Sequence, residues 1–295
     1  MPNIFSITVT YNPDLLILER QINSLIKENI RLIIIDNGSN NQSDIINICD
    51  KYDIVNFNLE KNEGLAFAQN LGAEKAIAMK ADYFILFDQD SVVNPGFIDS
   101  LYSTYIKLSS KGEKVGAVGP SFYDPYDGKK YPPTRYVGPL IKKIKEQDLA
   151  TRVTFLIASG SLIPVENYKL IGPFTNELFV DYIDVEWSLR CKKYGYNVYM
   201  IGNALMAHTI GDKRKNILGR TVSVHSPVRR YYLIRNSLYM LRLSYIPFGY
   251  KLRELSFNFL RCIVAVIYSD NRMNTLRFIF LGLKHGMLGK YGKGI

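Results

Sequence analysis

Residues 83–91 read Tyr-Phe-Ile-Leu-Phe-Asp-Gln-Asp-Ser, an apolar run that ends in two carboxylates. Five large apolar residues in succession are typical of a strand that is buried on both faces of a parallel sheet. Asp88 and Asp90 follow at the carboxyl end of this strand. Because open α/β sheets bind their ligands outside the carboxyl ends of the strands, this stretch predicts both an α/β fold and the edge of its site.

The chain on either side of this stretch alternates between strands and helices. Before it, elements are expected at 4–10, 14–29, 31–35, 42–51, 54–57 and 64–80. After it, strands are expected at 115–118, 153–157, 161–163 and 196–201, with a helix at 184–194 and helices from 228 onward. The Pro-, Gly- and Tyr-rich connection from Pro120 to Pro139 is expected to form a loop or lid. We expect an α/β domain over residues 1–225, with a mostly parallel sheet flanked by helices, and a basic helical region over residues 226–295.

The net charge of +10 comes from the C-terminal region. From Arg229 onward, 12 Lys or Arg stand against two acidic residues, which accounts for the whole excess. A basic region on a neutral body indicates an anionic partner: membrane phospholipid, a lipid pyrophosphate or nucleic acid. The apolar faces of these helices also need a cover, so a homo-oligomer formed through them is a further expectation.

The sequence predicts a cytoplasmic protein. Its start shows no signal-peptide pattern, and no apolar run reaches the ~20 residues of a transmembrane helix. Three widely spaced cysteines predict reduced thiols rather than a disulfide framework. The mixture of Lys or Arg with Phe, Leu and Tyr near the C-terminus favours peripheral attachment to the inner face of the membrane.

Polar residues gather at the carboxyl ends of three apolar strands. They are Thr10-Tyr11-Asn12, Asp36-Asn37-Gly38-Ser39 and Asp88-Gln89-Asp90. The last group suits a hard cation, because Mg²⁺ takes one or two carboxylates together with phosphate oxygens. Such a cation stabilises a departing diphosphate as a Lewis acid. The alternative is that these acids only cap or solvate loops, and that the second group is simply a turn.

Residues that suit an anionic ligand lie elsewhere in the chain. Asn62 and Gly64 precede a helix that carries Asn70, and the N-terminus of a helix attracts anions, although a plain helix entry explains the same residues. Arg230 suits a pyrophosphate contact, the alternative being a solvated helix face. His208 is a candidate third contact to metal or phosphate, although a lone histidine is more often a packed residue.

A second acidic group occupies residues 181–187, which contain three carboxylates. Asp181 and Asp184 are candidates for a general base that takes the proton from an attacking hydroxyl. Acids in the first turn of a helix also complement the helix dipole without any catalytic role. Glu186 stands four residues before Arg190, a spacing that indicates a structural ion pair.

Taken in order, these segments resemble the family-2 glycosyltransferases of the GT-A fold. The matching pieces run from about residue 4 to 240 and are VTYNP, IIIDNGS, NEGLAFAQNLG, FILFDQDS, SGSLI and FVDYIDVEWSLRCKKYGY followed by MAH. Within the family the chain is most similar to bacterial rhamnosyltransferases of O-antigen and cell-wall polysaccharide, through DQDS, FVDYIDVEW and RRYYLIRN. The resemblance implies inverting transfer of L-rhamnose from dTDP-L-rhamnose to a saccharide or polyprenyl-diphosphate-linked acceptor, with Mg²⁺ or Mn²⁺.

The resemblance also implies which residues hold the donor and the metal. Asp90 would be the metal ligand, with Asp88 and His208 beside it. The residues that would contact the nucleotide sugar are Thr10, Tyr11, Asn12, Asp36, Asn37, Asn62, Gly64, Asn70, Asp88, Gln89 and Arg230.

The general base is assigned by the same resemblance. Asp184 stands where the family's base falls, and Asp181 is the competing candidate because Ile183 replaces the Glu that often precedes that base. The residues expected to face the acceptor are Ser159, Gly160 and Trp187.

Other classes of protein explain less of the pattern. A glycosyltransferase that uses a UDP-hexose keeps the fold and changes only the donor. In a haloacid-dehalogenase-like phosphatase Asp88 would be the nucleophile, but that motif normally opens the chain. A nucleic-acid-binding protein explains the charge but not the acids at strand ends, and no recognition pattern for nucleic acid appears. A dinucleotide oxidoreductase would need G-x-G-x-x-G after the first strand.

Overall fold

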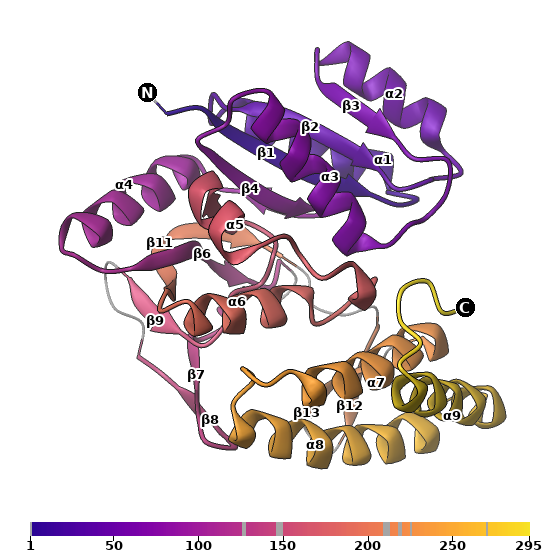
Figure 1. The fold of residues 1–295 in the computed structure, drawn as a ribbon. Helices are drawn as coiled ribbons and strands as arrows, with labels where there is room; N and C mark the ends of the chain where they lie inside the picture. Colours follow the sequence, from indigo (N-terminus) through magenta and orange to yellow (C-terminus); the bar gives the residue numbers. More distant parts are fainter. Residues whose placement is uncertain are drawn as a thin grey trace. The chain divides into compact units, whose positions relative to one another are not determined.

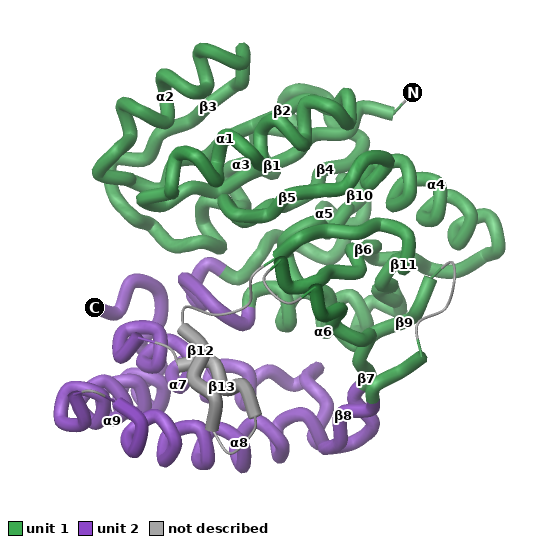
Figure 2. Tube along the Cα trace, turned by 180° about the vertical axis from the view of Figure 1, so that it is seen from behind, with its two compact units in different colours: residues 1–135, 143–175, 183–209 green, residues 136–142, 176–182, 210–295 purple. Residues whose placement is uncertain are grey.

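The computed structural model (Figure 1) describes residues 2–125, 128–145, 150–208, 213–217, 220–224, 226–269 and 271–295, with the backbone alone for 213–217 and 220–224. The chain forms two compact units (Figure 2). The first contains residues 1–135, 143–175 and 183–209, and the second contains residues 136–142, 176–182 and 210–295. The division expected between residues 225 and 226 stays a prediction, and residue 225 itself lies outside the described residues.

The first unit is built on a mixed sheet with the strand order β3-β2-β1-β4-β10-β6-β11-β5, and β9 pairs with β11. Its strands are β1 (Ile4–Thr10), β2 (Arg31–Asp36), β3 (Val55–Asn58), β4 (Tyr83–Asp88), β5 (Val92–Val93), β6 (Val115–Tyr123), β9 (Thr151–Val153), β10 (Leu162–Pro164) and β11 (Asn197–Ala207). The pairs β1–β2, β2–β3, β1–β4 and β6–β11 are parallel. Because the chain adds β2 and β3 on one side of β1 and β4 on the other, the strand order reverses at β1, where such sheets open a ligand crevice.

Helices cover both faces of this sheet (Figure 1). They are α1 (Leu15–Ile26), α2 (Gln42–Lys51), α3 (Leu65–Ala78), α4 (Phe97–Ser110), α5 (Val165–Ile171) and α6 (Ile183–Lys193). Leu18 of α1 and Ile45 of α2 pack in one cluster with Ile34 of β2. Gly72 of α3 instead lies against Ile35, the next residue of the same strand. Successive side chains of a strand point to opposite faces, so α3 covers the face opposite α1 and α2.

The second unit consists of helices and short strands. The helices are α7 (Pro227–Arg242), α8 (Phe248–Ile267) and α9 (Arg272–Leu288), and β12 (Lys213–Ile217) pairs with β13 (Arg220–Val224). Gly282 and Gly286 let α9 approach α7 closely, because a Cβ at Gly282 would lie 2.8 Å from the Tyr231 carbonyl oxygen. Among the described residues, none of the helices combines the length and apolar character that crossing a bilayer requires.

Most expected elements are confirmed, and two are wrong in part. Residues 154–157 are not a strand, because β9 ends at Val153. The connection from Pro120 to Pro139 is not all loop, because β6 continues to Tyr123 and β7 (Thr134–Val137) pairs with β8 (Leu140–Lys143). The 14-residue helix α4 was not expected.

Candidate active site

The carboxyl ends of β1, β2 and β4 lie together and are joined by hydrogen bonds. Thr10 and Asp36 are opposite each other in the ladder, and Thr10 Oγ1 donates to Asp36 Oδ1 at 2.9 Å. The Tyr11 backbone N–H donates to Gln89 Oε1 at 2.8 Å, which ties the end of β1 to the segment after β4. The gathering of polar residues that the sequence predicted at these strand ends is therefore confirmed.

Asp36 organises the loop that follows β2. It is fully buried, and its carboxylate accepts hydrogen bonds from Thr10 Oγ1, from the Ser39 backbone and hydroxyl, and from Gln42 Nε2. Ser39 Oγ in turn accepts a hydrogen bond from the Asn12 backbone N–H at 2.8 Å. These contacts describe a positioning role for Asp36, and a direct contact between Asp36 and a nucleoside stays a prediction.

Asn37 joins the same loop to the entry of α3. Its Nδ2 donates to Asn62 Oδ1 at 3.2 Å, and its Oδ1 accepts from the Glu63 backbone N–H at 3.0 Å. Gly38 has a φ of 77°, and a Cβ there would lie 2.5 Å from Lys61 Cα. Two loops that are far apart in sequence thus form one wall. Gly64, with a φ of 96°, is the N-cap of α3 at the edge of this wall.

Asp88, Asp90 and His208 form a group that could hold a metal ion. One ligand atom from each of the three lies within 4.8 Å of the other two. His208 Nε2 is 3.9 Å from Asp88 Oδ2, and His208 Nδ1 is 4.0 Å from Asp90 Oδ1. β5 brings them together, because the residues just after Asp90 pair antiparallel with the end of β11, directly before His208.

Two buried serines hold this group in place. Ser91 Oγ lies 3.1 Å from His208 Nδ1 and 2.7 Å from Ser159 Oγ. Ser159 Oγ accepts a hydrogen bond from the Asp88 backbone N–H at 3.1 Å. Partners of this kind orient metal ligands. Ser91 was not among the predicted site residues, although it follows Asp90 directly in the sequence.

The donor set of these three residues fits a divalent metal ion. The side chains of Asp88 and Asp90 are 38% and 42% exposed, so ligand oxygens can reach them, whereas that of His208 is 11% exposed. Two carboxylates leave room for phosphate oxygens and water, which Mg²⁺ and Mn²⁺ prefer, and an imidazole suits Mn²⁺ better than Mg²⁺.

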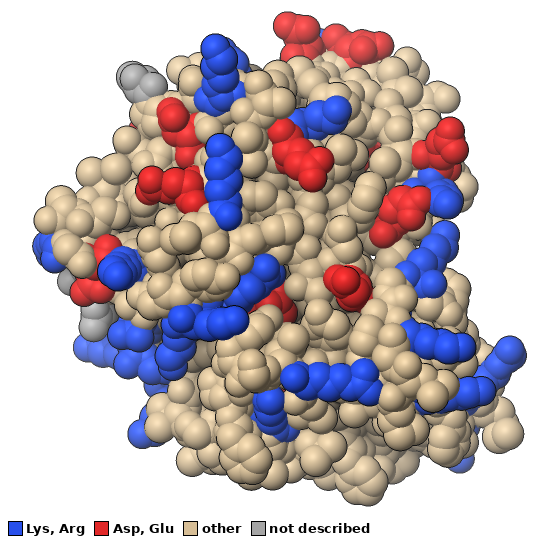
Figure 3. Space-filling view, viewed as in Figure 1, with Lys and Arg blue, Asp and Glu red and all other residues tan. Residues whose placement is uncertain are grey.

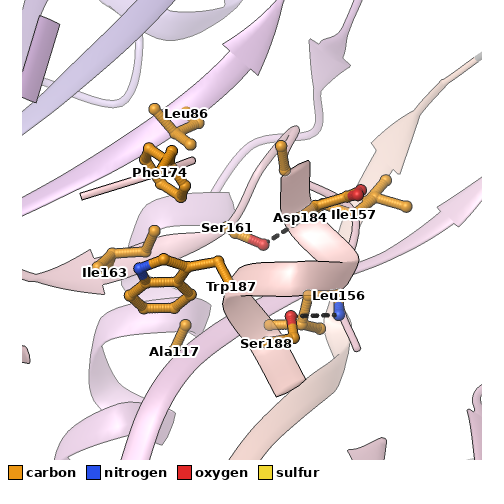
Figure 4. Close-up of a pocket in the computed structure, with 11 residues that line it drawn as sticks. Leu86, Ala117, Leu156, Ile157, Ser161, Ile163, Phe174, Asp184, Trp187 and Ser188 are labelled. Atoms are coloured by element: carbon orange, nitrogen blue, oxygen red, sulfur yellow. Dashed lines mark hydrogen bonds between the residues drawn. The ribbon is translucent and has the colours of Figure 1, made fainter. Parts of the chain in front are cut away.

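Asp184 lies in the first turn of α6 and lines a hollow between that helix and the sheet (Figure 4). The hollow is small, with a volume of about 20 Å³, room for roughly one water molecule. Most of its other lining residues are apolar, including Leu86 of β4 and Trp187 of α6. Asp184 is the one carboxylate among the residues that line it.

The two other acids of residues 181–187 are engaged in ion pairs. Asp181 belongs to the second unit, where Arg229 Nη2 lies 3.0 Å from its Oδ1. Glu186 is buried and pairs with Arg190 at 2.8 Å, which confirms the structural ion pair predicted from their spacing. The choice between Asp181 and Asp184 as general base stays a prediction.

Several other predicted contacts lie inside the protein. Asn70 is buried and bonds with both its amide atoms to the backbone of Phe174. Trp187 is buried, and its Nε1 donates to the Gly172 carbonyl at 3.0 Å. These contacts favour packing roles for Asn70 and Trp187 over direct contacts to sugars.

Gly160 and Arg230 lie in surroundings other than those of Asn70 and Trp187. Gly160 has a φ of 78° and donates to the Leu86 carbonyl at 2.7 Å, which places Ser159 under Asp88. Arg230, in the second unit, is buried, and its Nε has no hydrogen-bond partner within the part of the chain that the structure describes. A contact of Arg230 with diphosphate and contacts of Ser159 and Gly160 with an acceptor stay predictions.

Comparison with known proteins gives consistent matches. The profile described as "Glycosyl transferase family 2" matches residues 6–171. The "dTDP-rhamnosyl transferase RfbF" of Shigella flexneri is 33% identical, over 99% of this chain and 98% of that protein.

Two solved structures show a similar fold. One is GalNAc-T7 with UDP, GalNAc and Mn²⁺ (TM-score 0.59, 16% identity, 88% of this chain), of whose chain this protein spans 58%, less than two thirds. The other is residues 1–349 of S. aureus TarS in complex with UDP-GlcNAc (TM-score 0.57, 15% identity, 98% of this chain and 88% of that chain). At such identities the likeness concerns the fold alone.

Proposed function

The chain belongs to glycosyl transferase family 2, and from this premise we propose that it transfers L-rhamnose from dTDP-L-rhamnose to a hydroxyl of a saccharide or lipid-linked acceptor. The group of Asp88, Asp90 and His208 at the crevice of the sheet is the observation that carries the transfer chemistry. The choice of sugar rests on the relative from Shigella flexneri, which is named for that donor and aligns along nearly its whole length.

Asp90, with Asp88 and His208, would hold Mg²⁺ or Mn²⁺. When bound, the metal supplies positive charge that stabilises the departing diphosphate. Ser91 beside His208 and Ser159 at the Asp88 backbone N–H would help hold these two metal ligands in place. The wall formed by Tyr11, Asn12, Asn37 and Asn62 would border the nucleoside.

Asp184 is the proposed general base of an inverting displacement. The acceptor hydroxyl gives its proton to the Asp184 carboxylate while its oxygen forms a bond to the anomeric carbon. The bond between that carbon and the diphosphate oxygen breaks on the opposite side, and dTDP leaves. Because bond formation and bond cleavage occur on opposite faces of the sugar, the anomeric configuration inverts.

We place this reaction in the synthesis of bacterial surface polysaccharide such as O-antigen. The acceptor is then a saccharide carried on a polyprenyl diphosphate, at the inner face of the cytoplasmic membrane. A glycosyltransferase that uses a UDP-hexose is the second candidate, since it would need the same metal group and the same base.

Calorimetry of donor binding tests the proposal. We expect dTDP-L-rhamnose to bind only with Mg²⁺ or Mn²⁺, and we expect Asp90→Asn to abolish this binding. Asp99→Asn, at an exposed position in the first turn of α4, is the matched control and should bind as the wild type does. Binding of UDP-glucose in preference to dTDP-L-rhamnose would keep the transfer chemistry and discard the rhamnosyl assignment, and binding of neither would contradict both.

A further inference from the structure

Helix α8 has its polar residues inside and its apolar residues outside. Its three buried residues, Tyr250, Glu254 and Asn258, follow one another at intervals of one turn. A stripe of large apolar residues on another side is 43–79% exposed: Phe248, Leu252, Leu255, Phe259, Ile263 and Ile267. A helix on the surface of a protein in water has the opposite arrangement. Contiguous apolar surface of this kind marks an interaction site.

Buried polar contacts fix α8 in this orientation. Glu254 Oε2 accepts a hydrogen bond from the Tyr182 hydroxyl at 2.6 Å, and the carboxylate lies 3.3 Å and 3.4 Å from the guanidinium groups of Arg253 and Arg261. Burial raises the pKa of Tyr182 well above its ordinary value, which keeps the proton that this hydrogen bond needs. Arg253 and Arg261 belong to α8 and would turn with Glu254, but Tyr182 lies outside the helix, so turning α8 to bury its apolar stripe would break the buried Tyr182–Glu254 hydrogen bond. The apolar stripe therefore stays outside.

The charge around the stripe is positive. The structure describes every residue of α7, α8 and α9. The one acidic residue among them is Glu254, and it is buried. Arg272, Arg277 and Lys284 of α9 are exposed. On the face drawn in Figure 3, α8 and α9 carry Lys and Arg and show no acidic side chain.

This combination of apolar and basic surface favours a lipid bilayer over a second copy of the chain. Two copies that met through α8 would bring like charges together, which disfavours association. A bilayer of anionic lipids instead supplies both the apolar layer and the counter-charge.

We propose that α8 lies in the plane of an anionic bilayer surface, with Leu255 and Phe259 among the acyl chains and the neighbouring Lys and Arg side chains at the headgroups. At 20 residues the helix is about 30 Å long, enough for an interfacial anchor that does not cross the membrane. This inference deepens the proposed function by naming the partner of the second unit. It holds whichever sugar the first unit transfers.

Cosedimentation of the full-length protein with vesicles tests the proposal. At physiological salt we expect binding to phosphatidylcholine vesicles that contain 30% phosphatidylglycerol, and at least tenfold weaker binding to phosphatidylcholine alone. The double variant Leu255→Ser/Phe259→Ser should weaken binding to the anionic vesicles by at least tenfold. Leu16→Ser/Leu170→Ser is the matched control, since both residues are exposed in the first unit, and it should bind as the wild type does.

The outcomes separate this inference from the proposed function. If the wild type does not bind anionic vesicles, or if both double variants lose vesicle binding equally, the proposal that α8 docks on a bilayer is overturned. A dimer in analytical ultracentrifugation that Leu255→Ser/Phe259→Ser dissociates, without vesicle binding, assigns the stripe to a second copy and overturns the proposal as well. Calorimetry with dTDP-L-rhamnose does not depend on the apolar stripe of α8, so failure there leaves the vesicle result standing.

Discussion

Asp184 differs from the neighbouring acids in what surrounds its carboxylate. Asp184 lines the hollow beside the sheet in the first unit, and Asp181 lies beside Arg229 in the second. We expect Asp184→Asn to lower kcat by about 10²–10⁴-fold, because a general base contributes an acceleration of that size. Its affinity for dTDP-L-rhamnose should stay within about threefold of wild type, since the amide keeps the shape of the carboxylate. Transfer assays and donor calorimetry measure the two quantities separately.

Asp181→Asn is the comparison that makes this test decisive. If Asp184 is the base, the Asp181 variant should lose stability with its ion pair but retain most of its activity once folded. The opposite ranking of the two variants would assign the base to Asp181 and would contradict our reading of the geometry.

Ser91 offers a test of how the metal group is held. Its hydroxyl contacts both His208 and Ser159 and is fully buried. Removing a group that orients a metal ligand typically costs 10–100-fold in metal affinity, so we expect about that loss for Mn²⁺ with dTDP in Ser91→Ala. The matched control is Ser100→Ala, which removes a hydroxyl of α4 that donates to the Gly96 carbonyl just before that helix. Equal affinities in the two variants would refute the positioning role.

Some residues of the site could be predicted from the sequence, and others could not. Asp88 and Asp90 could be found because the apolar strand before them fixes their place at the sheet edge. Ser91 takes its role from the pairing of β5 with β11, which joins segments more than 100 residues apart. The buried position of Trp187 depends on the packing of α6 and could not be read from spacing.

At the scale of elements, the contact between α3 and β1 depends on Gly72. A Cβ at this position would overlap Ile7 Cγ2 and lie 3.2 Å from Ile35 Cγ1. Alanine gains about 1 kcal/mol in helix propensity over glycine, but overpacking costs about 1–3 kcal/mol, so we expect Gly72→Ala to lower the free energy of unfolding. Urea unfolding measures this. Ser103→Ala, on the exposed side of α4, should be neutral or slightly stabilising and serves as the control.

A double-mutant cycle with Ile7→Ala identifies the cause. If the two side chains collide, the double variant should be destabilised by less than the sum of the single variants. Additive effects would place the strain elsewhere.

The elements that the sequence predicts correctly share strong local signals. The strand at 31–35 is a continuous apolar run stopped by the turn residues from Asp36 to Ser39. β10, in contrast, has three residues and lies antiparallel between β4 and β6, a place that only long-range pairing decides. A helical region from residue 228 onward was predicted, but the orientation of α8 follows from the buried Tyr182–Glu254 hydrogen bond.

At the scale of the whole molecule, the three cysteines report on the two units separately. Cys49 and Cys191 are buried in the first unit, and Cys262 belongs to the second. Burial raises the pKa of all three thiols, that of Cys49 to about 11. Only the thiolate reacts with alkylating reagents, so each cysteine should label slowly until its own unit opens.

Because the cysteines lie in different units, their labelling should respond differently to urea and to lipid. Without lipid the apolar stripe of α8 faces water, so we expect the second unit to open first and Cys262 to become reactive to pulsed iodoacetamide at a lower urea concentration than Cys49 and Cys191. Vesicles with 30% phosphatidylglycerol bind the folded second unit and should raise the urea midpoint of Cys262 labelling, because a ligand that binds only the folded state stabilises it. The midpoints of Cys49 and Cys191 should change little. Peptide mass spectrometry resolves the three sites, and a single common midpoint that moves as a whole would show that the two units unfold as one cooperative body.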